Sequence, residues 1–97
     1  MMELLEKMAD YMEDEIGDVM KYIEEAKQCK ESELSDVFYQ ISLQEGKHYE
    51  ILLEALSKIM NRESTSAEEK AVYEFIRKHL KKSYDRATRT IEEFKQS

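Results

Sequence analysis

The sequence contains no proline and no tryptophan, and its 97 residues include only two glycines, Gly17 and Gly46. Proline and glycine are the residues that most often end helices and form tight turns, so a chain this poor in them has few places to break. A sheet needs many turns to connect its strands, and this sequence supplies few of the residues that favour them. Because 38% of the residues are charged and 41% are hydrophobic, we predict an all-α protein built from long amphipathic helices.

Cysteine is scarce as well, and Cys29 is the only one. One cysteine cannot form a disulfide within the chain, and the absence of four cysteines excludes a rubredoxin-type iron centre and a cysteine-based zinc finger. The sequence shows neither a signal peptide, with its charged start and apolar core, nor an apolar run long enough to span a bilayer. We therefore expect a protein of the reducing cytoplasm that does not associate with membranes.

Positive charge is in the minority, because 15 Lys and Arg face 22 Asp and Glu and give a formal net charge of -7. Such a chain repels a phosphate backbone, so we exclude nucleic acid as its partner. The imbalance lies in the first part: residues 1–63 hold 7 Lys and Arg against 16 Asp and Glu, whereas residues 64–97 hold 8 against 6. We expect the two parts to attract each other, within one chain or between chains.

Apolar residues recur at helical spacing in three stretches, which predict helices over about residues 3–29, 33–60 and 66–94 of a single domain, residues 1–97. The polar segments 30–33 and 61–66 separate them. Ser32 is placed to cap the second helix, and Ser66 with Glu69 forms the pattern of a capping box at the start of the third. One face of the third helix is basic and is either solvated or meets an acidic partner surface; it carries Lys78, Lys81, Lys82, Arg86 and Arg89.

Three helices are one short of a closed four-helix bundle, and a chain of 97 residues buries a modest share of its surface. The short break after residue 29 makes the first two helices an antiparallel hairpin. Pairing two chains would complete a four-helix bundle, so we expect a homodimer or a larger even-numbered homo-oligomer.

Three polar residues interrupt the apolar stripes of this hairpin. Glu15 falls near the centre of the stripe on the first helix, and Glu45 falls within the stripe on the second, with His48 one turn farther along the same face. If the turn centres near residues 30 and 31, Glu15 and Glu45 each lie about 15 residues, or about 22 Å, from it, and they meet at one level. Ionised carboxylates buried without a partner are unfavourable, so two that face each other require a cation.

The types of these side chains indicate a metal site. A Glu and a His at positions i and i+3 share one helix face and can bind the same ion. Carboxylates with one imidazole per ion favour Fe or Mn over structural zinc, so we predict iron at Glu15, Glu45 and His48, with Mn or Zn as substitutes. Three ligands leave an octahedral ion incomplete, and two facing hairpins would supply the rest. The alternative without metal is that Glu15 and Glu45 border a narrower core and reach solvent through their long side chains.

The same residues carry a resemblance to a known family. Residues 14–16 (DEI) and 42–52 (SLQEGKHYEIL) resemble the ferritin and rubrerythrin superfamily, and over residues 8–60 the chain is most similar to the half-length encapsulated ferritins and related small bacterial ferritin-like proteins. The resemblance implies a di-iron site at a subunit interface, which oxidises Fe(II) with dioxygen or peroxide within a larger symmetric oligomer. It also implies that Glu15 is the ligand from the first helix, Glu45 the bridging carboxylate and His48 the imidazole ligand, so that the three residues are both metal-binding and catalytic.

The chain departs from this family in two places. Residues 92–97 (EEFKQS) do not resemble the apolar targeting tail of encapsulin cargo, and an encapsulin shell is left open as a partner. The third helix has no second Glu-x-x-His, because Glu74 and His79 are five residues apart and point to different faces, and this argues against an intrachain di-iron site of the rubrerythrin type. We expect His79 to be a core or interface residue.

Three functions follow in order of preference. The first is a ferroxidase-type oxidoreductase that binds Fe(II) at Glu15, Glu45 and His48 and oxidises it. The second is a non-catalytic protein in which bound metal only fastens a helical assembly. The third is a metal-free helical interaction module.

Overall fold

The computed structural model describes residues 1–62 and 64–97, and in them the chain forms three helices and no strand. The helices are α1 (Met2–Gln28), α2 (Ser32–Met60) and α3 (Ala67–Gln96). The predicted all-α class and the three predicted helices are thus confirmed, with ends that differ from the expected ones by at most two residues. The predicted break at 61–66 includes Glu63, which lies outside the described residues.

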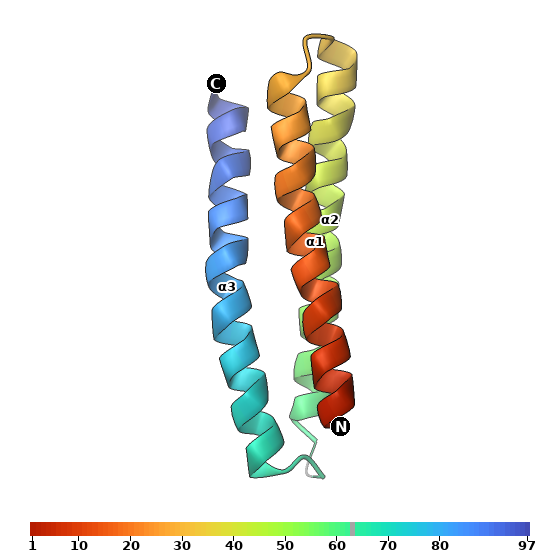
Figure 1. Cartoon of the computed structure of the whole chain (residues 1–97), viewed down its shortest axis with the longest axis vertical. Helices are drawn as coiled ribbons and strands as arrows, with labels where there is room; N and C mark the ends of the chain where they lie inside the picture. The colour runs from red at the N-terminus through yellow and green to blue at the C-terminus, as the bar shows by residue number, and fades with distance from the viewer. Residues whose placement is uncertain (63) are drawn as a thin grey trace.

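The helices lie side by side in a rod of 51 × 17 × 16 Å (Figure 1). α2 runs antiparallel to α1, and α3 returns parallel to α1, so that the C-terminus lies near the connection between α1 and α2. No helix of the described residues is long and apolar enough to cross a membrane. The structure is therefore a three-helix bundle, and its completion to four helices by a second copy stays a prediction.

The predicted cap of α3 is present, and the predicted cap of α2 is wrong by one residue. The Ser66 hydroxyl accepts from the Glu69 N–H at 3.1 Å, and the Ser66 N–H donates to the Glu69 carboxylate at 3.0 Å. This hydrogen bonding lowers the pKa of Glu69. At α2 the N-cap is Glu31, whose carboxylate accepts from the Glu33 N–H at 3.4 Å, and Ser32 is the first helical residue. Glu31 takes the role because it is the last residue with extended backbone.

The core is built in heptads. Residues seven apart form the innermost row of each helix, and such spacing is typical of helices that cross at a small left-handed angle. The rows are Leu5, Met12, Val19 and Ala26 on α1, then Ser35, Ser42, Tyr49 and Leu56 on α2, then Tyr73, Leu80, Ala87 and Phe94 on α3; all are buried or half-buried.

Two serines fix the register of α1 and α2. The Ser42 hydroxyl donates to the Val19 carbonyl at 2.8 Å, and the Ser35 hydroxyl donates to the Ala26 carbonyl at 2.7 Å. The two serines are seven residues apart on α2, and the two carbonyls that they contact are seven residues apart on α1. Both hydrogen bonds therefore fit the same alignment of the two helices. That alignment decides which residues of α1 and α2 face each other along the whole hairpin.

Candidate metal centre

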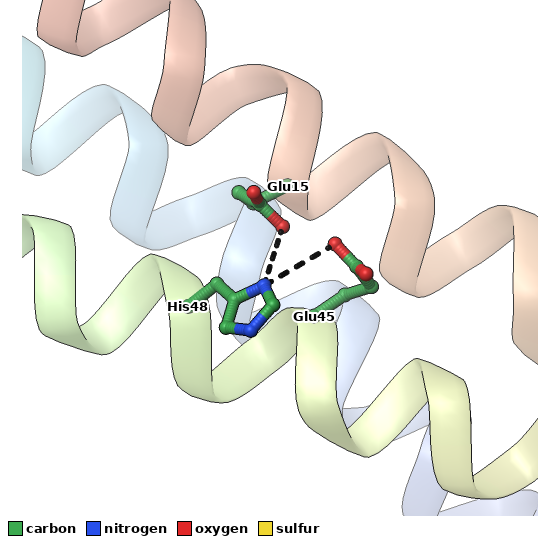
Figure 2. A group of neighbouring side chains, drawn as sticks. All are labelled: Glu15, Glu45 and His48. Atoms are coloured by element: carbon green, nitrogen blue, oxygen red, sulfur yellow. Dashed lines mark ion pairs between the residues drawn. The ribbon is translucent and has the colours of Figure 1, made fainter.

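The structure brings Glu15, Glu45 and His48 together. Each offers one ligand atom, and these atoms lie within 4.8 Å of one another. Glu15 comes from α1, while Glu45 and His48 come from adjacent turns of α2 (Figure 2). In this view the side chains lie between α1 and α2, and α3 lies behind them. The three predicted ligand residues therefore form one cluster on the side of the α1/α2 hairpin that faces away from α3, which we call its open side.

The register explains why the two glutamates meet. In the alignment set by Ser42 and Ser35, Glu15 faces Glu45, and the pair one heptad closer to the turn is Tyr22 with Phe38. The rings of that pair stack with centroids 6.2 Å apart. Glu15 and Glu45 thus occupy the heptad positions that hold a pair of stacked aromatic rings in the next layer of the hairpin.

The site lies at the border of the core, and the predicted position of Glu15 near the centre of its stripe is wrong. The buried stripe of α1 runs through Met12, Ile16, Val19 and Ile23. The side chains of Glu15 and Glu45 are 24% and 19% exposed, and that of His48 is 54% exposed. Leu4 is apolar but exposed and lies outside this stripe, so apolar character alone does not mark the buried side of α1.

The electrostatics of the cluster favour a positive charge. Glu15 Oε2 is buried and accepts no hydrogen bond, and two ionised carboxylates have no proton to donate to each other. The pKa of Glu45 is raised, first because a proton on it is stabilised by hydrogen bonding to Glu15, then because of burial and the negative charge of Glu15, while His48 opposes the shift. Either a proton or a cation therefore relieves the pair.

His48 presents Nδ1 to both carboxylates. Its distances are 3.5 Å to Glu15 Oε2 and 3.8 Å to Glu45 Oε2, longer than good hydrogen bonds. Two carboxylates and one imidazole are ligands that Fe, Mn and Zn accept, so the residues present fit a metal ion. Three ligands leave further coordination positions for a second copy of the chain, for water or for a reactant.

Gly46, Tyr49 and His79 do not take part in the cluster. Gly46 faces α3, because a Cβ there would lie 3.5 Å from the Tyr84 hydroxyl. Tyr49 is buried and packs on Tyr84 with ring centroids 4.3 Å apart, and burial raises its pKa. His79 is exposed and stacks on Phe75, so of its two expected places, the core or an interface, the core is excluded and the interface stays a prediction.

The sequence did not point to Tyr84, which fastens α3 to α2 beside the site. Its hydroxyl donates to Glu50 Oε1 at 2.9 Å and lies 3.4 Å from the Gly46 carbonyl oxygen. Burial, followed by the hydrogen bond to Glu50, raises the pKa of Tyr84. The only signal in the sequence was its place one turn after Leu80 on the apolar side of α3.

The described surface is also hollowed between α2 and α3, away from the glutamates. A groove of about 480 Å³ is lined there by Leu53, Tyr73 and Arg77, among others, and it contains none of Glu15, Glu45 and His48. Its lining includes no group of metal ligands of the kind found at Glu15. The glutamate cluster, and not this groove, is the chemically distinctive site.

Three comparisons with known proteins add no identity. Models of protein families, curated proteins and solved structures were all compared with the chain, and none matches it. What the chain does must therefore be argued from its own residues and their arrangement.

Proposed function

We propose that two copies of the chain pair through the open side of the α1/α2 hairpin, bind Fe(II) between them at Glu15, Glu45 and His48, and oxidise it to Fe(III). The observation that carries this proposal is the facing pair of carboxylates, half-buried with one buried oxygen lacking a hydrogen-bond partner. A reducing cytoplasmic setting, which suits a chain with one cysteine, would keep iron in the Fe(II) form.

The hairpin surface around the site supports pairing with a second copy. Exposed large hydrophobic side chains are concentrated on α1 and α2 and include Leu4, Tyr11, Leu34, Val37 and Ile51. Tyr11 lies one turn before Glu15, and Ile51 lies one turn after His48, so apolar surface adjoins the cluster. Contiguous exposed apolar surface is typical of protein contacts.

The ligand count also supports pairing. Two copies related by a two-fold axis at the site would bring together four carboxylates and two imidazoles, the set used by ferritin-like di-iron bundles. Four negative charges would be balanced by two divalent cations. Each copy alone offers three ligands, too few for an octahedral ion.

The residues have distinct roles in the reaction. Glu15 and Glu45 hold the ions through their oxygens and stabilise the higher charge of Fe(III), while His48 completes each half of the ligand set. Two Fe(II) would together supply two electrons, which with two protons from solvent reduce one dioxygen to hydrogen peroxide or one hydrogen peroxide to two waters. The apolar surface around the cluster, once covered by the second copy, would limit the access of water.

The test is Fe(II) oxidation by wild-type protein and by Glu45→Gln, with Glu54→Gln as matched control on the same helix. Glu54 is 72% exposed and pairs with Lys58 on the same helix, so its change leaves the cluster intact. Under oxygen, we expect ferric absorbance to rise faster with wild type and with Glu54→Gln than in buffer, and no acceleration with Glu45→Gln. Undiminished oxidation by Glu45→Gln would remove the proposal.

Metal analysis separates the other functions. Stoichiometric binding of Fe, Mn or Zn without faster oxidation would favour the non-catalytic, metal-fastened assembly. No bound metal, and a melting temperature that a chelator leaves unchanged, would favour the metal-free interaction module.

A further inference from the structure

A second charged surface lies away from the glutamate cluster, on the outer sides of α1 and α3. The acidic stripe of α1 is exposed and consists of Glu3, Glu6, Asp10 and Glu13. The basic stripe of α3 is exposed and consists of Lys78, Lys82, Arg86 and Arg89. Each set recurs at spacings of three or four residues and so forms one helix face.

The two stripes lie at the same level of the rod. Tyr49 packs on Tyr84, and Tyr39 packs on Phe94 with ring centroids 5.5 Å apart, which fixes α3 against the hairpin. Together with the α1/α2 register, these contacts bring Asp10 near the height of Lys82. Figure 1 shows α1 and α3 side by side and parallel.

These charges are not paired within the chain. Among residues 1–62 and 64–97, every ion pair of 4.0 Å or less joins residues of one helix or joins α1 to α2, and none joins α1 to α3. The cations of α3 that do pair are Arg77 and Lys81, which bind Glu74 and Asp85 on the same helix. The basic stripe itself stays free in the described part of the chain.

We propose that the α1/α3 face is a second self-association surface, on which the acidic stripe of one copy meets the basic stripe of another. A two-fold axis parallel to the helices places α1 of each copy opposite α3 of its partner, with the matching levels aligned. An axis across the helices would instead oppose α1 to α1, acid against acid. Charge complementarity therefore selects both the partner and the arrangement.

The area of the α1/α3 face and an exposed aromatic side chain on it also support a second copy of the chain as the partner. A face of the 51 × 17 Å rod is comparable with the roughly 800 Å² that a standard interface buries on each partner. Phe75 is 73% exposed and stacks on His79 beside the basic stripe. An aromatic side chain this exposed is stabilised when a partner covers it.

Charge exchange tests the proposal without relying on the metal site. Lys82→Glu with Arg86→Glu should halve the molar mass in chelator at low salt, and adding Asp10→Lys with Glu13→Lys to the same chain should restore it. Lys47→Glu with Lys58→Glu, an equal change at exposed residues of α2, is the control and should leave the mass unchanged. Mass is read by light scattering, and circular dichroism checks that each variant is folded.

A salt series on the wild type gives an answer even if a variant fails to fold. Its mass should fall about twofold as salt rises to about 1 M, where the Debye length is about 3 Å. Any of three results overturns the proposal: the wild type is monomeric at low salt, its mass does not change with salt, or the charge exchange does not restore the mass lost on charge reversal. Binding of an acidic polymer to the basic stripe would not rescue the proposal in these cases. Loss of metal binding in Glu45→Gln with the salt effect retained would separate this surface from the proposed oxidation site.

Discussion

The Ser42 hydroxyl donates a hydrogen bond to the Val19 carbonyl at 2.8 Å, and both residues are buried. The short Ser42 side chain thus reaches the backbone of α1 at this layer. Glu45 lies one turn after Ser42 and Glu15 one turn before Val19, so this contact holds the two carboxylates at one level. The buried Ser42 therefore sets both the packing of α1 on α2 and the relative position of the two carboxylates.

Ser42→Ala should destabilise the metal-free protein by about 1 kcal/mol, the usual net contribution of one hydrogen bond. The Val19 carbonyl keeps its bond within α1, so the loss should not exceed this. Ser57→Ala, at a half-buried position of the same helix, provides the control because both changes gain the same helix propensity. Urea unfolding at one protein concentration compares the two, and equal free energies of unfolding would contradict the role given to Ser42.

The stability of the metal-free protein should fall as pH rises from 4.5 toward neutrality. The folded state raises the pKa of Glu45 above its ordinary 4.5, so in this window the folded protein holds more protons than the unfolded chain. The free energy of unfolding then decreases with pH until Glu45 is fully ionised. Glu45→Gln removes the titrating group.

Thermal melts across this range in chelator measure the effect. The wild type should lose stability with rising pH relative to Glu45→Gln, and the exposed control Glu54→Gln should behave like the wild type. Parallel curves for wild type and Glu45→Gln would show that the carboxylates do not interact as their geometry indicates.

Glu15→Gln should raise the stability of the metal-free protein and abolish its response to metal. The substitution removes a negative charge facing Glu45 and supplies an amide N–H to a position that lacks a hydrogen bond. In the wild type, an ion at about 100 times its Kd should add about 2.7 kcal/mol to the free energy of unfolding. Melts with and without Mn(II) under anaerobic conditions measure both effects.

Glu25→Gln, at an exposed position of α1, is the matched control for Glu15→Gln and should retain the metal response. An equal metal-induced shift in Glu15→Gln would exclude Glu15 as a ligand. A metal-free protein that Glu15→Gln destabilises would contradict the repulsion between the two carboxylates.

The sequence was sufficient for the three helices, because their apolar residues repeat regularly and the breaks are short. It was also sufficient to bring Glu15, Glu45 and His48 together, since an antiparallel hairpin with a known turn fixes which residues share a level.

Features that depend on the third helix could not be read from the pattern. An apolar stripe shows roughly which side of a helix faces the core. How wide the buried part of that side is depends on where the neighbouring helices pack against it. For this reason Glu15 was expected at the centre of its stripe and lies at the border, and His79, expected in the core or at an interface, lies outside the core and is exposed. The contact of Tyr84 with Glu50 joins residues 34 apart, which helical periodicity does not connect.

Gly17→Ala should stabilise the protein by about 0.5–1 kcal/mol, because glycine inside a helix costs about this much relative to alanine. A Cβ at Gly17 would meet nothing within 4 Å, whereas one at Gly46 would lie 3.5 Å from the Tyr84 hydroxyl and 3.9 Å from Val19 Cγ2. Gly46→Ala should gain less, since its methyl group would contact a hydroxyl that donates to Glu50 Oε1 and lies 3.4 Å from the Gly46 carbonyl oxygen, and any shift of that hydroxyl would weaken the attachment of α3. Thermal unfolding at about 1 M salt, where surface charge pairing is screened, measures the helix effect alone. A Gly17→Ala protein less stable than wild type under these conditions would mean that another surface covers the outer face of α1 at this residue.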